Sequence, residues 1–351
     1  MTAGLRVVAP GLMTTVQDLG RFGYQHLGVP VSGALDRVSL AAANLLAGNP
    51  PEMGGLEIAY QGPSLAVEAD SVRIALAGGQ AHVEIVAPDG QASRRLSLFE
   101  SARLRRGEVL KVGALSGSAV LYLAVEGGFD IAPVMGSQST LTRGAIGGFA
   151  GRALRAGDVL PLRQAIAAER GEVMLPTLDL SPPARIRVIL GPQDDYFTKM
   201  GLATLLGSTY TTSRASDRMG IRLEGPPLEH SAKGYNIVSD GIATGAIQVP
   251  GNGLPIVLLA DRQTTGGYPK IAAVISADIP ALGRMVPGSR VAFEAVNVEM
   301  AEAAARQLAA RMAEMAGEIG PARTDPVIDA ARLMGENLIS GTVDAREASP
   351  G

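Results

Sequence analysis

The sequence predicts a mainly β protein with a few helices. Short apolar segments rich in Val, Ile and Leu lie between glycine or proline residues along much of the chain, a pattern typical of strands joined by tight turns. Its 351 residues include 44 glycines and 22 prolines, which suit a barrel or sandwich better than a helix bundle. The length corresponds to about two domains, and a hydrophobic content of 46% can form a large core.

The expected strands are apolar runs that end at turn residues. Clear examples are 72–77, 104–112, 119–125, 185–190 and 290–295. Three helices are expected. The first, 34–47, has Ser32 or Asp36 near its start and Gly48 at its end; the second is 194–206, closed by Gly207; the third is 298–316, rich in Ala, Glu, Arg and Met.

A short internal repeat indicates two related halves. A Gly-Gly-aromatic motif at 127–129 follows one apolar strand, and the same motif at 266–268 follows another. The proline-containing stretch 177–183 is the expected joint. The sequence therefore predicts an N-terminal subdomain over 1–180, a C-terminal subdomain over 181–318 and a variable, partly disordered tail over 319–351.

Charge and composition exclude several classes of function. The chain has 31 Lys and Arg against 34 Asp and Glu, a formal net charge of −3, and therefore no basic stripe for nucleic acid and no polybasic membrane anchor. The absence of cysteine excludes disulfides, zinc–thiolate sites and a cysteine nucleophile. The N-terminus lacks the apolar stretch of a signal peptide, and no run approaches a membrane span. We expect a cytoplasmic protein.

Familiar catalytic signatures are missing as well. None of the three histidines, His26, His82 and His230, stands at metal-ligand spacing with another histidine or a carboxylate pair. His26 fits either a proton carrier or a structural residue, and the other two are expected to be structural. The sequence contains no P-loop, no nucleophile elbow of the G-x-S-x-G type and no dinucleotide-binding glycine motif after a strand. A hydrogen-bonding site remains as the expected chemistry.

The most informative segment is 260–270, which directly follows the apolar run 256–259. It places a carboxylate, a guanidinium, an amide, two hydroxyls, two glycines and an ammonium in one loop, more hydrogen-bonding capacity than a turn requires. We expect a ligand there. The candidate residues are Asp261, Gln263, Thr264, Thr265, Gly266, Gly267, Tyr268 and Lys270, with Gln248 from a neighbouring apolar segment.

The residue types of this loop suit an amide, lactam or ureido group. Carboxamide and carboxylate side chains supply both donors and acceptors, and the backbone N–H groups of the two glycines can stabilise an oxyanion. Lys270 or Arg262 can neutralise a carboxylate or phosphate. The alternative is that Asp261 and Arg262 only pair within the turn and that the glycines only allow positive φ.

A second polar segment, 14–21, is followed closely by 30–36 (Pro-Val-Ser-Gly-Ala-Leu-Asp). Its candidate substrate-binding residues are Thr14, Thr15, Gln17, Arg21 and Ser32. Asp18 joins Asp261 and Lys270 as an expected catalytic residue. The alternative is a turn in which Asp18 bonds its own backbone, with Ser32 and Asp36 starting the next helix. We expect 14–21 and 260–270 to line one cleft where the subdomains meet, with Gln17 or Asp18 close to 263–268.

Other motifs accompany these two segments: 191–193 (Gly-Pro-Gln), 216–220 (Ser-Asp-Arg-Met-Gly), 224–227 (Glu-Gly-Pro-Pro) and 245–250 (Gly-Ala-Ile-Gln-Val-Pro). Asp217 and Arg218 are expected to form a local ion pair near Glu224, and Gln193 either meets an anion or caps a turn. Together the motifs resemble the allophanate hydrolase subunit 2 family, also called the biotin-dependent carboxyltransferase family, over roughly residues 5–300. Its members include the C subunit of 5-oxoprolinase and the carboxyltransferase domain of urea amidolyase.

The resemblance implies two cyclophilin-like β-barrel subdomains and a function. As a free-standing chain, this protein most resembles the C subunit of an ATP-dependent 5-oxoprolinase. That complex opens the lactam of 5-oxo-L-proline to L-glutamate. Its other members are a separate A subunit and a cyclophilin-like B subunit. ATP is then bound by the complex, and the substrate is small and amide-like.

The resemblance leaves two alternatives. One is the carboxyltransferase component of a urea carboxylase or allophanate pathway, which would need biotin on a separate partner because the chain has no Ala-Met-Lys-Met segment. The other is a non-enzymatic antagonist that binds a kinase inhibitor similar to the B subunit.

Overall fold

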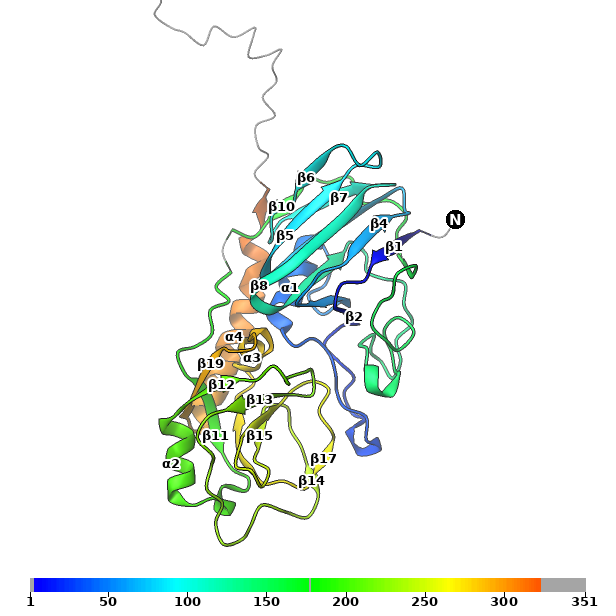
Figure 1. Ribbon diagram of the computed structural model, residues 1–351. Helices are drawn as coiled ribbons and strands as arrows, with labels where there is room; N and C mark the ends of the chain where they lie inside the picture. Colours follow the sequence, from blue (N-terminus) through cyan, green and yellow to red (C-terminus); the bar gives the residue numbers. More distant parts are fainter. Residues whose placement is uncertain (1–2, 177, 323–351) are drawn as a thin grey trace, which may run out of the picture.

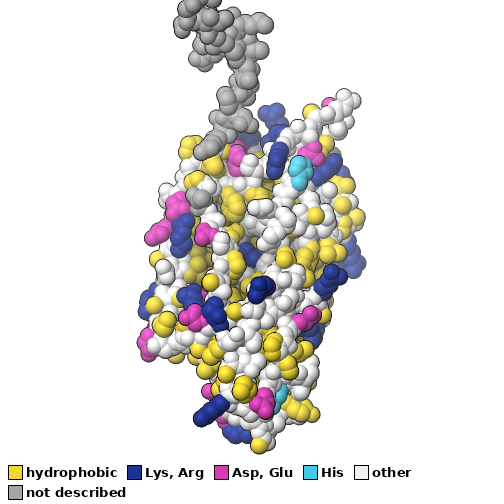
Figure 2. Space-filling view, turned by 60° about the vertical axis from the view of Figure 1, so that its left-hand side comes forward, with side chains coloured by type: hydrophobic (Ala, Val, Ile, Leu, Met, Phe, Trp, Pro, Cys, Tyr) yellow, Lys and Arg dark blue, Asp and Glu magenta, His cyan; other side chains and the backbone are white. Residues whose placement is uncertain are grey.

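The computed structural model describes residues 3–176 and 178–322. A sheet-rich N-terminal part and a C-terminal barrel lie end to end, with one long helix running beside both (Figure 1). The prediction of a mainly β protein with few helices is confirmed. In the described ranges, no helix is long and apolar enough to cross a membrane. On the face shown in Figure 2, basic and acidic side chains are interspersed, as the near-zero net charge predicts.

The N-terminal part is a nine-stranded antiparallel sheet that curves into a half-barrel. Its strands are β1 (Gly4–Ala9), β2 (Met13–Gln17), β3 (Gly55–Ala59), β4 (Ser64–Val67), β5 (Ser71–Val86), β6 (Ser93–Arg95), β7 (Ser101–Arg105), β8 (Val109–Val125) and β9 (Val159–Pro161). The order is β2-β3-β8-β4-β1-β9, and β5 pairs with β6, β7 and β8. Alternate side chains, such as Leu56, Ile58 and Leu121, form the core inside the curved sheet.

The expected strand 104–112 is wrong. The strand β7 ends at Arg105 and β8 begins at Val109, so that a turn interrupts the predicted run. Gly107 adopts a φ of +85° in this turn and donates its N–H to the carbonyl of Val67. The turn contains Arg106, Gly107 and Glu108, and this charged segment with its glycine was the signal that separates the two strands.

The C-terminal part is a closed barrel. In barrel order its strands are β11 (Ile186–Leu190), β18 (Lys270–Val274), β15 (Ala246–Gln248), β16 (Ile256–Leu258), β13 (Gly220–Glu224), β12 (Thr209–Thr212) and β19 (Arg290–Ala295). Closure comes from the parallel pair β11 and β19, whereas the other pairs are antiparallel. Beside the barrel, β14 (Asp240–Gly241) and β17 (Thr265–Gly266) form a two-stranded sheet. The chain thus combines a half-barrel with a full barrel.

Helix α1 (Arg37–Ala47) starts three residues later than expected. Its N-cap is Asp36, whose carboxylate accepts from the N–H groups of Val38 and Ser39, and it ends at Gly48 with a φ of +87°. The expected helix 194–206 is split into a short 3-10 helix, η3 (Asp194–Tyr196), and α2 (Lys199–Gly207). The new start is set by Thr198, which caps α2 by accepting from Gly201.

The remaining helices join the two parts. Short segments η1 (Gln25–Leu27) and η2 (Thr142–Gly144) lie in loops, and α3 (Ile279–Arg284) packs against β8 of the half-barrel. The long helix α4 (Val298–Glu318) starts where it is expected, capped by Asn297. Figure 1 shows it running from the barrel to α1. Its Met315 is buried in the cluster between α1 and the N-terminal sheet.

The chain then returns to the N-terminal part. The strand β20 (Gly320–Pro321) pairs with β10 (Val173–Met174), so the first residues of the expected tail form an edge strand. The rest of that tail, 323–351, lies outside the described residues.

Candidate functional site

A cavity of about 330 Å³ lies where the half-barrel meets the barrel. Its walls come from both parts and include Thr15, Glu57, Tyr60, Arg218, Leu259 and Gly283. The contact is close: a Cβ placed on Gly283 of α3 would come within 2.4 Å of the carbonyl oxygen of Leu35. Most of the lining is apolar, and its buried charges belong to one network.

Arg218 is the centre of this network. Its Nη1 donates to the Glu57 carboxylate, its Nε and Nη2 donate to Asp261 at 2.8 and 3.1 Å, and Nη2 also donates to the carbonyl of Gly33 at 2.7 Å. Tyr122 donates its hydroxyl to the second oxygen of Glu57 at 2.5 Å. We call Glu57, Tyr122, Arg218 and Asp261 the junction cluster. It joins the two subdomains through charge-assisted hydrogen bonds.

Electrostatics within the junction cluster follow from burial and mutual contact. Burial alone would lower the pKa of Arg218, but the carboxylates of Glu57 and Asp261 raise it far above its ordinary value. Burial, and then the charges of Glu57 and Asp36, raise the pKa of Tyr122 well above its usual range. The arginine therefore stays charged and the phenol stays neutral.

Local structure explains how these side chains reach the junction. In β3, Leu56 and Ile58 enter the core of the half-barrel, so Glu57 between them must face the other way. On the barrel side, the N–H of Asp261 donates to the carbonyl of Arg218 at 2.9 Å, which fixes the two partners beside each other.

The expected ion pair between Asp217 and Arg218 is wrong. Asp217 accepts from the N–H groups of Met219 and Gly220, which closes its own turn, and pairs at the surface with Arg143. Likewise, Asp261 does not pair with Arg262. The Arg262 guanidinium donates to the carbonyls of Ile242 and Leu259 instead. Burial lowers the pKa of Arg262.

The residues of the first predicted segment bond mainly to the stretch 137–140. The Asp18 carboxylate accepts from the Ser137 hydroxyl and the Gln138 N–H, both at 2.6 Å, and from its own neighbour Gly20 at 2.8 Å. Asp18 thus bonds its own turn, as the alternative for this segment predicts, and also holds the stretch 137–140. Gln17 donates to Thr15 at 3.0 Å and to the Thr140 carbonyl at 3.1 Å. At the start of the segment, the buried hydroxyl of Thr14 donates to the carbonyl of Pro10 at 2.7 Å.

Several predicted residues carry buried polar atoms without a hydrogen-bond partner in the described structure. These atoms are Gln17 Oε1, Arg21 Nε, Arg21 Nη1, Ser32 Oγ and Gln248 Nε2. The Arg21 guanidinium makes one bond, to the Ser139 carbonyl, and burial lowers its pKa against the opposing charges of Asp18 and Asp261. Unpartnered buried groups are costly and rare, so their concentration around two predicted loops indicates groups that meet a ligand or water.

The start of the second loop meets the stretch 30–36, which follows the first loop. Ser32 donates its N–H to the carbonyl of Ala260 at 3.1 Å, and Asp261 is close enough to Arg21 to act on its pKa. Further along, the second loop stays within the barrel. No hydrogen bond between described residues joins Gln17 or Asp18 to 263–268.

The far end of the second loop forms what we call the barrel cluster: Gln193, Asp240, Gln248, Gln263 and Lys270. Gln263 donates to Gln248 at 3.2 Å, and Lys270 pairs with Asp240 at 2.8 Å. Gln193 bridges the cluster by accepting from the Lys270 N–H and donating to Asp240.

The other residues of this loop complete its hairpin with the segment 237–242. The carbonyls of Thr264 and Gly267 accept from Ile242 and Ile237, Thr265 and Gly266 form β17, and Tyr268 is exposed.

Of the three histidines, His230 makes structural contacts. His230 lies 4.9 Å from the Phe197 ring and its Nε2 is 3.2 Å from the Val249 carbonyl oxygen, whereas His26 and His82 are exposed. Within 3–176 and 178–322, no group of three or more histidine or acidic side chains could hold a metal ion.

Sequence reasoning missed Glu57 and Tyr122. Glu57 is the polar residue of an otherwise apolar strand, and Tyr122 is the polar residue of the apolar run 119–125; that pattern was the signal that could have found them.

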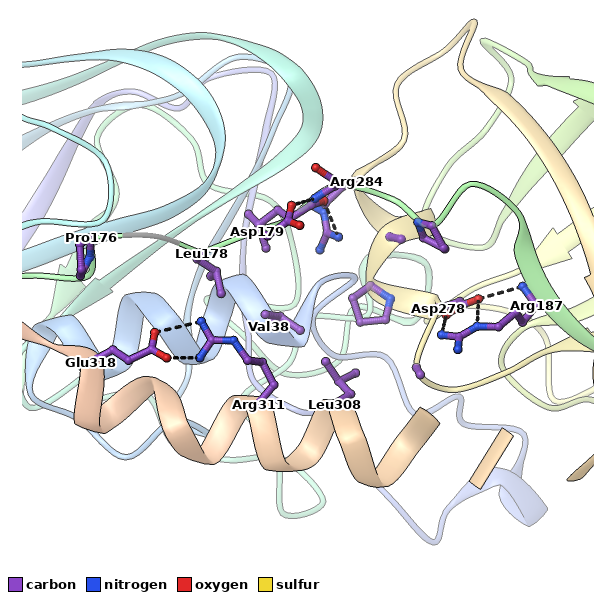
Figure 3. Close-up of a pocket in the computed structure, with 16 residues that line it drawn as sticks. Val38, Pro176, Leu178, Asp179, Arg187, Asp278, Arg284, Leu308, Arg311 and Glu318 are labelled. Atoms are coloured by element: carbon purple, nitrogen blue, oxygen red, sulfur yellow. Dashed lines mark hydrogen bonds and ion pairs between the residues drawn. The ribbon is translucent and has the colours of Figure 1, made fainter. Parts of the chain in front are cut away.

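A cavity of about 960 Å³ lies between Pro176, the segment 178–183, α3 and α4. Figure 3 shows that its arginines are already paired: Arg187 with Asp278 and Arg311 with Glu318. Arg284 pairs with Asp36 at 2.7 Å. We place the candidate site at the smaller cavity between the subdomains, because Thr15, which bonds Gln17 of the first predicted segment, lines it, and its Arg218 bonds Asp261 of the second.

Comparisons with known proteins agree with the motifs. Residues 27–295 match the family described as carboxyltransferase domain, subdomain A and B. The chain is 36% identical over 301 residues to the 5-oxoprolinase C subunit of Escherichia coli, covering 85% of this chain and 93% of that one. It is 35% identical over 289 residues to the 5-oxoprolinase C subunit of Haemophilus influenzae, covering 82% of this chain and 89% of that one.

A solved structure shares the fold. The crystal structure of the K. lactis urea amidolyase matches with a TM-score of 0.80 at 27% identity, covering 93% of this chain. The match spans only 21% of that much longer chain.

Proposed function

The chain belongs to the family of the carboxyltransferase domain, subdomain A and B, and from that premise we propose that it is the C subunit of an ATP-dependent 5-oxoprolinase. In this proposal it opens the lactam of 5-oxo-L-proline to L-glutamate together with the A and B subunits. Similarity along nearly the whole length of two such C subunits supports the assignment.

The observation that carries the proposal is the set of unpartnered buried atoms around the two predicted loops. A lactam acid needs an acceptor for its N–H, a donor for its carbonyl and a cation for its carboxylate. Gln17 Oε1 is such an acceptor, and Nε and Nη1 of Arg21 in the same segment are unpartnered donors for the carbonyl and the carboxylate. Thr15, which bonds Gln17, lines the cavity between the subdomains.

The chemical difficulty lies in the lactam carbonyl. Water must add to its carbon and the C–N bond must break, yielding the carboxylate and amine of glutamate, but an amide carbon is a poor electrophile. Phosphorylation of the carbonyl oxygen supplies a leaving group. This chain contributes by holding the amide and by keeping bulk water away while the carbonyl oxygen is phosphorylated, since the walls of the cavity are mainly apolar.

The three expected catalytic residues differ in how well they suit this chemistry. Asp261 faces the junction and is oriented by two bonds from Arg218, so it remains our candidate for direct contact with substrate. Asp18 acts as a positioning residue for 137–139, and Lys270 through its pair with Asp240 positions the barrel cluster.

The residues at the junction do not fit a triphosphate. Arg218 is neutralised by two carboxylates, and the sequence has no phosphate-binding glycine loop. We therefore assign ATP binding to the partner proteins.

The decisive experiment is reconstitution. The chain alone, and the chain purified with its A and B partners, are incubated with 5-oxoproline and ATP, and glutamate and phosphate are measured. We expect both products only from the complete complex. Turnover by the isolated chain, or a complete complex that consumes no 5-oxoproline, would refute the assignment.

The fold match to urea amidolyase supports a second candidate, the carboxyltransferase component of a biotin-dependent urea carboxylase. It would require a biotin carrier and a biotin carboxylase, neither of which lies within these 351 residues. Adding urea and a carboxylated biotin carrier to the isolated chain tests it. Carboxylation of urea without the A and B partners would favour this candidate, whereas tight binding to a protein similar to the B partner without any turnover would favour the antagonist.

A further inference from the structure

A second cavity lies on the α4 side of the junction. Its volume is about 640 Å³, within the usual range of small-molecule sites. Leu19, Val31, Ser32, Arg37, Ile279 and Ala301 are among its lining residues, so the segment 19–37, α3 and the start of α4 all contribute walls. It shares only Leu35 and Leu259 with the junction cavity.

Two polar atoms of this cavity's lining residues are buried without a partner: Ser32 Oγ and Arg37 Nε. Ser32 is only 5% exposed. In the described part of the chain, Arg37 makes no side-chain hydrogen bond or ion pair. The acidic residue of the lining, Glu302, is exposed and pairs with Arg306. The cavity therefore combines an apolar surface with an uncompensated cation and a free hydroxyl.

The wall that carries Ser32 is rigidly held. Ser32 adopts a φ of +57°, and its N–H donates to the carbonyl of Ala260. On either side, Val31 accepts from the Arg21 N–H at 2.8 Å and Ala34 donates to the Asp18 carbonyl at 2.9 Å. Backbone bonds to two separate segments fix the position of the hydroxyl before any ligand arrives, which favours binding.

We propose that this cavity binds a small molecule with an apolar body and a single carboxylate. The carboxylate satisfies the Arg37 guanidinium and the Ser32 hydroxyl, both of which are donors, and the apolar body lies against Leu19, Val31 and Ile279. A neutral alcohol leaves the guanidinium without a counter-charge, and an amine is repelled by it. The proposal goes beyond the 5-oxoprolinase assignment, because it requires neither the lactam substrate nor the partner proteins.

Isothermal titration of the isolated full chain with octanoate tests the site, with octanol and octylamine as probes of the same length. We expect octanoate to bind at one site per chain and at least about tenfold more tightly than either probe, the scale of a charge-assisted hydrogen bond. Equal affinity for octanol would overturn the proposal, as would the absence of octanoate binding.

Variants locate the binding. Arg37→Gln should weaken octanoate binding at least about tenfold, and Ser32→Ala about three- to tenfold, because a neutral hydrogen bond contributes less. Ala301→Trp should abolish binding by filling the cavity. Arg95→Gln, at an exposed arginine of β6, is the matched control and should bind like the parent. Thermal unfolding confirms that each variant is folded. Unchanged affinity in folded Arg37→Gln would exclude this cavity.

Discussion

The junction cluster and the barrel cluster lie at opposite ends of one polar loop, yet they differ in what surrounds them. Asp261 reaches across to Glu57 through Arg218, so the junction cluster is shared by two subdomains and deeply buried. Lys270 pairs with Asp240, whose side chain is 52% exposed, and all members of that cluster belong to the C-terminal subdomain. One loop therefore fixes the subdomains relative to each other at one end and presents polar groups near the surface at the other.

Removal of the shared cation should have the largest effect. Arg218→Met leaves the carboxylates of Glu57 and Asp261 buried without their partner, and we expect the free energy of unfolding to fall by about 3–5 kcal/mol. Urea denaturation followed by circular dichroism measures it.

Arg306→Met provides the matched control, because this arginine pairs with Glu302 at the surface of α4. Its loss should change the free energy of unfolding by less than about 1 kcal/mol. If Arg218→Met costs no more than this control, the junction cluster does not hold the subdomains together.

The second prediction asks whether both ends of the loop serve one reaction. In the assembled complex, Asp261→Asn and Gln263→Ala should each lower kcat/KM for 5-oxoproline by on the order of a hundredfold, the usual scale for one well-placed polar group. Steady-state kinetics with purified complex provides the measurement.

Gln91→Ala, at an exposed amide beside β6, is the control for losing one glutamine. A Gln263→Ala complex with parental kinetics and a lower melting temperature would restrict the barrel cluster to a structural role. The two ends of the loop would then be functionally separate.

Local signals in the sequence predicted much of the fold. The glycine that ends α1 and the start of α4 depend on neighbouring residues, and so they are evident from the sequence alone; for the start of α1 the sequence left Ser32 and Asp36 as alternatives. The polar loop 260–270 is evident in the same way. Partners across the junction are not evident from the sequence, because Arg218 and Glu57 are 161 residues apart and their pairing depends on how the two subdomains pack. For the same reason, sequence proximity wrongly favoured Asp217 as the partner of Arg218.

The smallest expected effect concerns the pH dependence of the pair that the buried Lys270 forms with the exposed Asp240 in the barrel cluster. A hydrogen bond from Lys270, followed by those from the Gly241 N–H and Gln193, lowers the pKa of Asp240 below its ordinary value. A carboxylate with a depressed pKa in the folded state stabilises the protein above its unfolded pKa of about 3.9, and this contribution is lost as the pH falls through the lower folded value. Because water reaches Asp240, the contribution is screened.

Asp240→Asn removes this titration while it keeps the shape of the side chain. We expect the parent to melt at a slightly higher temperature than the variant near pH 6, and this difference to shrink as the pH drops below about 4, where the parental carboxylate also becomes neutral. Asp89→Asn, at an exposed carboxylate in the β5–β6 turn, controls for the loss of one surface charge. A difference between Asp240→Asn and the parent that persists undiminished in acid would mean that packing, not the Lys270 ion pair, holds this end of the loop.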